Sequence, residues 1–496
     1  MNDGADGYRT DIDYIYSYYT ELNPLRLRLA LLNAGLKAPV ITTACELGFG
    51  QGVSLGIHAA ASAVDWHGTD INPAHAGFAR ALAEASGAEA GFHTDSFVDF
   101  SRRNLPMFDY IGLHGVWSWI SDGNRAAIVT FIQHRLKPGG VLYMGYNALP
   151  GWAAFSPLRH LLVEHANRAG SEATPIADRI DQAMTFADRL LAANPGFARD
   201  NPGVADSFKT LNEEDRHYLA HEFFNRDWQP MHFATVARWL APADVSYACA
   251  TDFTDHIDAM GLSAAQRSLL ADVGDAGLRE TVRDLIVNQR FRRDYWIRGA
   301  ERLSAADRTE ALRHERVIAV THQLELPLKL RAALALSQTG PGEAAYGSVL
   351  EILGDGKVRS LGQLEQTLRP KGISLDQVVE AVILIASCGL IQAAQDDSVT
   401  ALVRPRTDRL NAHLIERARI SDDVHDLASP VTGGGIHVSR KEQLFLAERR
   451  RGETRPDEWA RAAASALAIE PTADLIAEAK TFADEMLPTL QLLQIV

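Results

Sequence analysis

A glycine-rich loop constrains the fold of this chain more than any other feature of its sequence. The loop runs Glu46-Leu47-Gly48-Phe49-Gly50-Gln51-Gly52, after a β-branched run at 40–45 and before a small-residue helix expected over 53–63. Glycine adopts backbone angles that other residues avoid, and it lets a ligand approach the main chain closely. A strand, a glycine loop and a helix in this order predict a ligand-binding turn at the edge of an α/β sheet.

Strand-like and helix-like segments continue to alternate after this loop. Further strands are predicted over 66–69, 91–94, 108–113 and 141–146, with helices between them that begin near Pro73 and Arg125. Such alternation is typical of a doubly wound parallel sheet with right-handed crossovers. We therefore predict the α/β class, with a Rossmann-like sheet, a helical insertion and mainly helical C-terminal domains that include a winged-helix-like module.

Acidic residues stand at the ends of the first three predicted strands. Glu46 precedes the first glycine, Asp70 follows Gly52 by 18 residues, and Asp95 ends the third strand. A carboxylate at the position of Asp70 can accept hydrogen bonds from ribose hydroxyls. The loop lacks the Gly-Lys-Ser/Thr of a triphosphate-binding loop, and its alternate glycines differ from the G-x-G-x-x-G of NAD-binding proteins.

This pattern resembles the class I S-adenosylmethionine-dependent methyltransferases. The resemblance implies S-adenosylmethionine as the cofactor, with the loop around its methionine part, Asp70 on its ribose, and Ser96 and Phe97 beside its adenine. The cofactor-binding residues that it implies are Glu46, Gly48, Gly50, Gly52, Asp70, Asp95, Ser96, Phe97 and His114.

A closer resemblance rests on Leu113-His114-Gly115-Val116-Trp117-Ser118-Trp119-Ile120 and on Gly145-Tyr146-Asn147-Ala148-Leu149-Pro150-Gly151-Trp152. These segments, with 218–224 and 228–233, resemble bacterial methyltransferases that carry a methyltransferase regulatory domain. That family includes rickettsial protein lysine methyltransferases, which modify outer-membrane protein. The resemblance covers roughly residues 10–330 and implies a lysine side chain as the methyl acceptor.

The two loops are expected to bring large aromatic side chains to the carboxyl ends of strands four and five, where ligands bind in open α/β sheets. For catalysis we predict that Tyr146 orients the amine, that His114 helps to remove its proton, and that Trp117 and Trp152 form aromatic walls. Packed core is the alternative for the tryptophans. Near the N-terminus, a lid over the cofactor or an amphipathic helix is expected to hold four tyrosines: Tyr14, Tyr16, Tyr18 and Tyr19.

The pattern of segments predicts a chain of several domains. A methyltransferase core at 1–157 is followed by a helical insertion at 158–215 and a return to the sheet at 216–255. Beyond these we expect an all-helical regulatory domain at 256–337, the winged-helix-like module at 338–400 and a C-terminal helical region at 401–496.

The charge of the chain argues against nucleic acids as partners. The net charge of −14 repels phosphate backbones, and the recognition-helix position of the winged-helix-like module, 374–387, carries no Lys or Arg. We therefore predict no nucleic-acid partner and either a lysine-bearing protein or a small molecule as substrate.

Three scattered cysteines and the absence of a CxxC pair predict reduced thiols in the cytoplasm. The first residues lack the features of a signal peptide, and we predict no membrane span. His217 and His221 have the spacing of paired ligands but lack an HExxH context, so we predict no metal site.

Two other functions stay open. One is O- or N-methylation of a small molecule or glycan, and the other is a catalytically silent binding scaffold. The intact Glu46, glycine loop and Asp70 speak against the scaffold. The sequence leaves the oligomeric state open.

Overall fold

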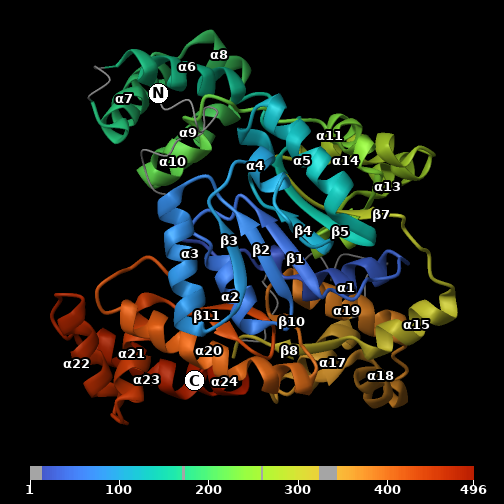
Figure 1. Cartoon of the computed structure of the whole chain (residues 1–496), viewed down its shortest axis with the longest axis vertical. Helices are drawn as coiled ribbons and strands as arrows, with labels where there is room; N and C mark the ends of the chain where they lie inside the picture. Colours follow the sequence, from blue (N-terminus) through green and yellow to red (C-terminus); the bar gives the residue numbers. More distant parts are fainter. Residues whose placement is uncertain (1–13, 170–173, 258–260, 323–342) are drawn as a thin grey trace.

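A seven-stranded mixed sheet forms the centre of the protein (Figure 1). The structure is a computed structural model that describes residues 14–169, 174–257, 261–322 and 343–496. The strand order is β3-β2-β1-β4-β5-β7-β6. The strands are β1 (Thr43–Leu47), β2 (Asp65–Thr69), β3 (Ala90–His93), β4 (Phe108–Leu113), β5 (Leu136–Asn147), β6 (Val245–Ala250) and β7 (Phe291–Arg298).

The first five strands confirm the predicted parallel core. β1 lies between β2 and β4, so that Glu46 is opposite Gly68 on one side and Gly112 on the other. Alternate residues of β1 belong to different cores: Ala44 packs in one apolar cluster, while Cys45 and Leu47 pack in another. The helices of this part are α1 (Pro24–Asn33), α2 (Val53–Ala61), α3 (Pro73–Ser86), α4 (Phe97–Ser101) and α5 (Asp122–Arg135).

The two strands β7 and β6 differ from the prediction. β7 runs antiparallel to both β5 and β6, so the sheet is mixed rather than wholly parallel. β7 also falls within 256–337, which we expected to be all-helical, and 216–255 supplies only β6. Three successive charged residues, Arg292, Arg293 and Asp294, conceal the strand in the sequence, because buried strands are usually apolar. Inside the fold, Arg292 Nε lies 2.8 Å from Asp294 Oδ2, so the two side chains neutralise each other's charge.

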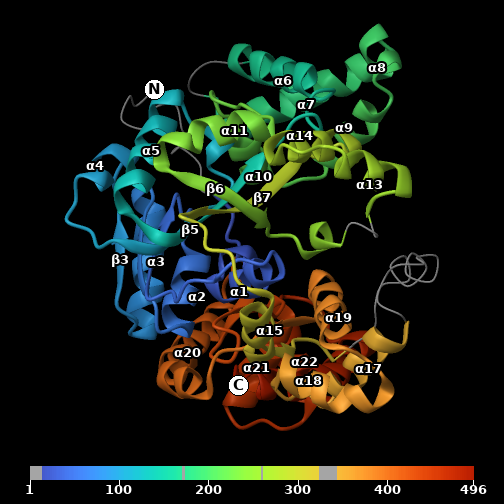
Figure 2. The same cartoon turned by 90° about the vertical axis from the view of Figure 1, so that its right-hand side faces the viewer.

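Helices cover the carboxyl end of the sheet and its β6–β7 edge (Figure 2). The stretch predicted as a helical insertion is indeed helical and has an apolar core of its own, which includes Leu162, Ile180 and Phe208. The helices of these parts are α6 (Ser156–Arg168), α7 (Ile176–Ala192), α8 (Gly196–Asp200), α9 (Gly203–Asn212), α10 (Arg216–Glu222), α11 (Phe233–Leu240), α13 (Ala264–Ala271) and α14 (Ala276–Val287). The next helix, α15 (Ala305–His314), lies apart from them and contacts α1.

A second, three-stranded antiparallel sheet in the order β10-β8-β9 lies with three helices in the next part of the chain. Its middle strand β8 precedes those helices in sequence, and the winged-helix assignment stays a prediction. The elements are β8 (Arg316–Ala319), α17 (Glu343–Leu353), β9 (Arg359–Ser360), α18 (Leu361–Leu368), α19 (Leu375–Ser387) and β10 (Ile391–Ala393).

The C-terminal part packs on the face of the central domain formed by α2 and α3. Its hairpin places Gly435 against the ring of Tyr18, since a Cβ atom on Gly435 would lie 2.9 Å from that ring. The elements are α20 (Asp397–Arg417), β11 (Asp426–Ser429), β12 (Gly434–His437), α21 (Arg440–Arg450), α22 (Pro456–Ala466), α23 (Ala473–Thr481) and α24 (Leu487–Leu492).

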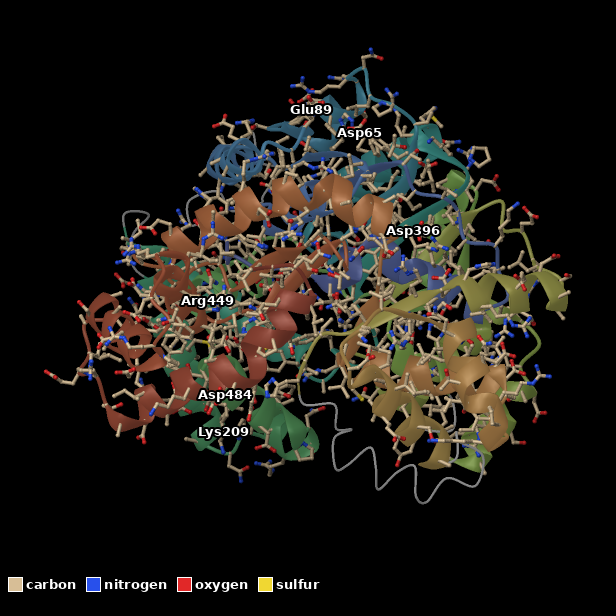
Figure 3. All side chains as sticks on the ribbon, turned by 90° about the horizontal axis from the view of Figure 1, so that it is seen from below. Asp65, Glu89, Lys209, Asp396, Arg449 and Asp484 are labelled. Atoms are coloured by element: carbon tan, nitrogen blue, oxygen red, sulfur yellow. The ribbon has the colours of Figure 1, made fainter. Side chains whose placement is uncertain are left out.

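The surface carries charges of both signs. The acidic Asp396 and Asp484 and the basic Lys209, which are labelled in Figure 3, are all exposed. Within the described ranges, no helix combines the length and the apolar character that crossing a bilayer requires. The prediction made for the first residues falls outside the described part of the chain.

Candidate active site

A cavity lies at the carboxyl ends of β1, β2 and β4, where the glycine loop passes from β1 to α2. Gly48 and Gly52 both have a φ of 72°. A Cβ atom on Gly48 would lie 2.6 Å from Val116 Cγ2, and one on Gly52 would lie 2.5 Å from Ala79 Cβ. Both positions therefore require glycine for conformation and for space. The loop thus exposes main chain to the cavity at the place where the sequence predicted it.

Asp70 is held rigidly at the end of β2. Its Oδ2 accepts a hydrogen bond from the Gly50 nitrogen at 2.9 Å, and its Oδ1 accepts one from the Asn72 nitrogen at 2.9 Å. His75 Nδ1 lies 3.1 Å from the same Oδ1. A carboxylate offers about four acceptor sites. The contacts with Gly50, Asn72 and His75 use three of those of Asp70, so about one remains for a ribose hydroxyl.

Glu46 is the buried carboxylate of the site. Its side chain is 3 % exposed, and Oε2 has no hydrogen-bond partner among the described residues. Burial, with a further contribution from the charge of Asp70, raises the pKa of Glu46 to about 8. Buried polar atoms in native proteins nearly always have a partner. The orphaned oxygen therefore fits a ligand that carries a hydrogen-bond donor, such as the ammonium group of a bound amino-acid moiety.

Asp95, Ser96 and Phe97 line the cavity beside β3. Arg103 Nη2 donates to Asp95 Oδ1 at 2.9 Å, and this partner lowers the pKa of Asp95. Ser96 caps α4 by accepting a hydrogen bond from the Asp99 nitrogen at 3.1 Å. The predicted adenine-side residues thus lie together, and Arg103 already neutralises the carboxylate of Asp95.

His114 forms a wall of the cavity. Its Nδ1 lies 2.6 Å from the hydroxyl of Tyr143, and its ring stacks on Tyr19 with the ring centroids 3.9 Å apart. Burial lowers the pKa of His114 to about 4. A neutral imidazole with so low a pKa is a weak proton acceptor for an amine.

Three other predicted catalytic residues do not line this cavity. Tyr146 is fully buried, and its hydroxyl donates to Asp294 Oδ2 at 3.1 Å. Trp117 is packed in the apolar core beside Trp239. Trp152 packs against Phe223 and Trp228. The structure therefore separates these three side chains from the cofactor residues that we predicted with them.

Trp119 and two of the N-terminal tyrosines also line the cavity. Trp119 takes the place expected for Trp117, because a 3₁₀ turn over Trp117–Trp119 directs the first ring into the core. Of the four N-terminal tyrosines, Tyr14 and Tyr19 line the cavity, whereas Tyr16 packs on Phe78 and Tyr18 reaches His58. The residues that line it are Tyr14, Tyr19, Glu46, Gly48, Phe49, Gly50, Asp70, Ile71, Asp95, Ser96, Phe97, His114, Gly115, Val116, Trp119, Ile120, Asn124, His221, Glu222 and Asn225.

Glu222, His221 and Asn225 enter the cavity from the end of α10. Asp215 caps this helix by accepting a hydrogen bond from the His217 nitrogen at 2.7 Å. Glu222 Oε1 accepts a hydrogen bond from the Tyr14 hydroxyl at 3.0 Å. These residues lie more than a hundred positions beyond β4 in sequence, and no local motif signals their place. Only the resemblance of 218–224 to a known family singled out this segment.

The electrostatic character of the cavity is acidic. Four carboxylates line it, those of Glu46, Asp70, Asp95 and Glu222, and its described lining contains no Lys or Arg. Among the described residues, no three or more His, Cys, Asp or Glu side chains are grouped so that they could hold a metal ion. The arrangement suits a ligand that carries positive charge or hydrogen-bond donors.

Comparison with known proteins gives matches along the whole chain. Residues 215–298 match the family described as "Predicted methyltransferase regulatory domain". An uncharacterized protein of Synechocystis sp. is 36% identical over 456 residues, which are 91% of this chain and 89% of that protein. An uncharacterized protein of Rickettsia prowazekii is 26% identical over 291 residues, which are 57% of this chain and 51% of that protein.

Among solved structures, PKMT2 from Rickettsia typhi in complex with AdoHcy has a similar fold. Its TM-score is 0.69 at 16% sequence identity, and the match covers 96% of this chain and 98% of that chain. A likeness at this identity concerns the fold, which extends over the sheet, the helical parts and the C-terminal region alike.

Proposed function

Because the chain belongs to the S-adenosylmethionine-dependent methyltransferases that carry a methyltransferase regulatory domain, we propose that it methylates lysine side chains of a protein. The observation that carries this proposal is the composition of the cavity. Four carboxylates and several aromatic rings line it, and no Lys or Arg stands among its described residues. Arg103 neutralises Asp95 and burial favours the uncharged form of Glu46, so Asp70 and Glu222 are the carboxylates that can attract an ammonium group. The lining offers no clamp for a phosphorylated or carboxylated acceptor.

The residues of the loop fit the proposed cofactor. Glu46 Oε2 offers an unused acceptor for an ammonium group, Asp70 retains room for a ribose hydroxyl, and Phe97 offers an apolar surface for a base. When bound, S-adenosylmethionine supplies a methyl group on a sulfonium centre. The protein then needs to hold the acceptor in line with that group, exclude water and remove one proton from the acceptor nitrogen.

A lysine acceptor must lose its proton before it can react. With an unperturbed pKa near 10.4, holding the amine neutral at pH 7 costs about 4.6 kcal/mol, which is roughly 3.4 pH units at 1.36 kcal/mol each. Aromatic walls such as Tyr19 and Trp119 reduce this cost because they desolvate the ammonium form. The apolar stem of lysine also suits these walls.

A transfer assay with radiolabelled S-adenosylmethionine tests this proposal. The purified protein is incubated with a lysate of its source organism, and the label is separated into protein and small-molecule fractions. We expect label in protein bands with the wild type and none with Asp70→Ala. Label confined to small molecules would favour methylation of a small molecule or glycan, and no label in either fraction would favour a silent scaffold.

A further inference from the structure

Glu222 is the one carboxylate of the described cavity lining that comes from outside the central sheet. It is the last residue of α10, and it lies within the stretch that matches the regulatory-domain family. Glu46, Asp70 and Asp95 each end or follow a strand and fit the parts of a nucleoside cofactor. Glu222 stands apart from that set, because it comes from α10 and not from the end of a strand.

Tyr14 fixes the position of Glu222 relative to the glycine loop. The tyrosine hydroxyl donates to Glu222 Oε1 at 3.0 Å, while a Cβ atom on Gly50 would lie 3.3 Å from the tyrosine ring. The carbonyl oxygen of Tyr14 accepts a hydrogen bond from Gln51 Nε2 at 3.0 Å. One side chain therefore spans from the loop to the carboxylate, and Glu222 faces the cofactor side of the cavity.

The lining of the same cavity contains a second hydrogen-bond acceptor, the side chain of Asn225. Asn225 is fully buried, and its Oδ1 has no partner among the described residues, although its amide nitrogen donates to the His221 carbonyl. Tyr14 is the sole hydrogen-bond partner of Glu222 within the described chain, so Oε2 is available to a ligand. An ammonium group, which carries three donors and no acceptor, matches this pair.

We propose that Glu222 Oε2 accepts the proton of the acceptor amine, while Asn225 Oδ1 holds a second N–H of the same nitrogen. This inference rests on the proposed function, and it assigns the proton step to the regulatory-domain segment rather than to the loops after β4 and β5. Tyr14 is the positioning residue, since it acts on the amine only through Glu222.

The step balances as follows for one turnover. An N–H bond of the ammonium breaks, its proton forms an O–H bond with Glu222 Oε2, and its electron pair stays on nitrogen. That pair forms the new N–CH₃ bond, and the electrons of the broken C–S bond remain on the sulfur of the product. The proton later leaves Glu222 to water, which returns the carboxylate.

The electrostatic surroundings support Glu222 over His114 in this role. Burial raises the pKa of Glu222 to about 7, although the Tyr14 hydrogen bond opposes this, while the pKa of His114 is lowered to about 4. Because a group with a lower pKa holds a proton less well, His114 is the weaker proton acceptor of the two. The titratable or charged groups near Glu222 are Tyr14, Tyr19, Tyr218 and His221, with Glu46, Asp70 and His114 across the cavity.

Turnover of Glu222→Gln as a function of pH gives the first test, with exposed Glu213→Gln as the matched control. At pH 7.5 we expect kcat to fall about a hundredfold, because an aligned proton acceptor contributes on that order. The deficit should shrink towards pH 10, about where the free amine becomes neutral in solution. A Glu222→Gln loss that is equal at all pH values, or no loss at all, would overturn the proposal.

Binding of n-butylamine, a mimic of the lysine side chain, gives a readout independent of turnover. Calorimetry on the protein saturated with S-adenosylhomocysteine should show binding to the wild type and to Glu213→Gln. Affinity should fall about tenfold or more in Glu222→Gln, as expected for the loss of a charge-assisted contact, with S-adenosylhomocysteine affinity unchanged. Equal butylamine affinity would refute the role of Glu222.

Tyr14→Phe separates positioning from a purely structural effect. Without the tyrosine donor, which lowers the pKa of Glu222, the pH midpoint of kcat should move upward, whereas a structural role would lower kcat without moving the midpoint. If the wild type methylates no protein, the proposed function fails. If it does, and these variants behave like the control, only the role of Glu222 fails.

Discussion

The main-chain nitrogen of Gly50 lies 2.9 Å from Oδ2 of Asp70. This hydrogen bond joins the middle of the glycine loop to the carboxylate at the end of the neighbouring strand. The loop and the carboxylate thus form one preorganised unit, and a change in either should affect cofactor binding through the other.

Replacing Asp70 with alanine should weaken binding of S-adenosylhomocysteine by at least about tenfold. The change removes a charge-assisted acceptor worth roughly 1.5–3 kcal/mol, and it also releases the Gly50 nitrogen from its partner. Isothermal titration calorimetry measures the effect. Asp65→Ala, an exposed residue at the other end of β2, is the control and should bind normally. Unchanged affinity in Asp70→Ala would remove Asp70 from the cofactor site.

Gly48→Ala should destabilise the protein and impair cofactor binding together. A residue other than glycine in the left-handed region costs about 1–2 kcal/mol, and the new Cβ would lie 2.6 Å from Val116 Cγ2. Gly77→Ala is a matched control in the exposed part of α3, where a Cβ atom meets nothing within 4 Å. It should stabilise the protein by about 0.5–1 kcal/mol. Thermal unfolding measures both effects. If the melting temperatures of the two variants shifted in the same direction, the account would be contradicted.

Glu46→Gln should stabilise the ligand-free protein at high pH while weakening cofactor binding. The folded-state pKa of Glu46 is raised to about 8 from the ordinary value near 4.5, so the folded protein holds this proton more tightly than the unfolded chain does. The wild type therefore loses stability as pH rises from about 4.5 to about 8, the window between these two pKa values. The melting temperature of the variant relative to wild type should increase across that window. A difference independent of pH would show that Glu46 is not buried as a carboxylate.

Tyr146→Phe should lower stability more than turnover. Its hydroxyl donates to buried Asp294, and the loss of a hydrogen bond to a charged group typically costs about 1.5–3 kcal/mol. Trp119→Ala, by contrast, removes a wall of the cavity and should lower acceptor binding. Denaturant unfolding and steady-state kinetics on both variants distinguish these roles. If Tyr146→Phe were stable but slow, Tyr146 would contact the acceptor as its position in the sequence first indicated.

Local patterns predicted that three acidic residues would meet at one edge of the sheet, and the structure places them there. Glu46, Asp70 and Asp95 each lie near the end of a strand, and the register of parallel strands brings such ends to one edge of the sheet. Neither tertiary contacts nor distant segments are needed to infer this. The capped start of α3 at Pro73, with Asn72 as its N-cap, follows from equally local signals.

The remaining lining of the cavity was harder to predict, for two physical reasons. A short 3₁₀ turn decides that Trp119 and not Trp117 faces the cavity, and hydropathy cannot distinguish two tryptophans separated by one serine. Glu222 reaches the cavity only through tertiary packing of α10, and 208 residues separate it from its partner Tyr14. Strand β7 escaped prediction because its buried charges are compensated by contacts that the sequence does not reveal, such as that between Arg292 and Asp284 at 2.6 Å.

The identity of the methylated atom tests the central claim most directly. Protein labelled in the transfer assay is hydrolysed to amino acids, and the label is located by mass spectrometry, with Asp70→Ala as the inactive control. The account predicts label on the side-chain nitrogen of lysine and nowhere else in the hydrolysate. Label on arginine, on a carboxylate ester or on a hydroxyl would contradict it, because the acidic cavity with Glu222 and Asn225 is built to receive an amine.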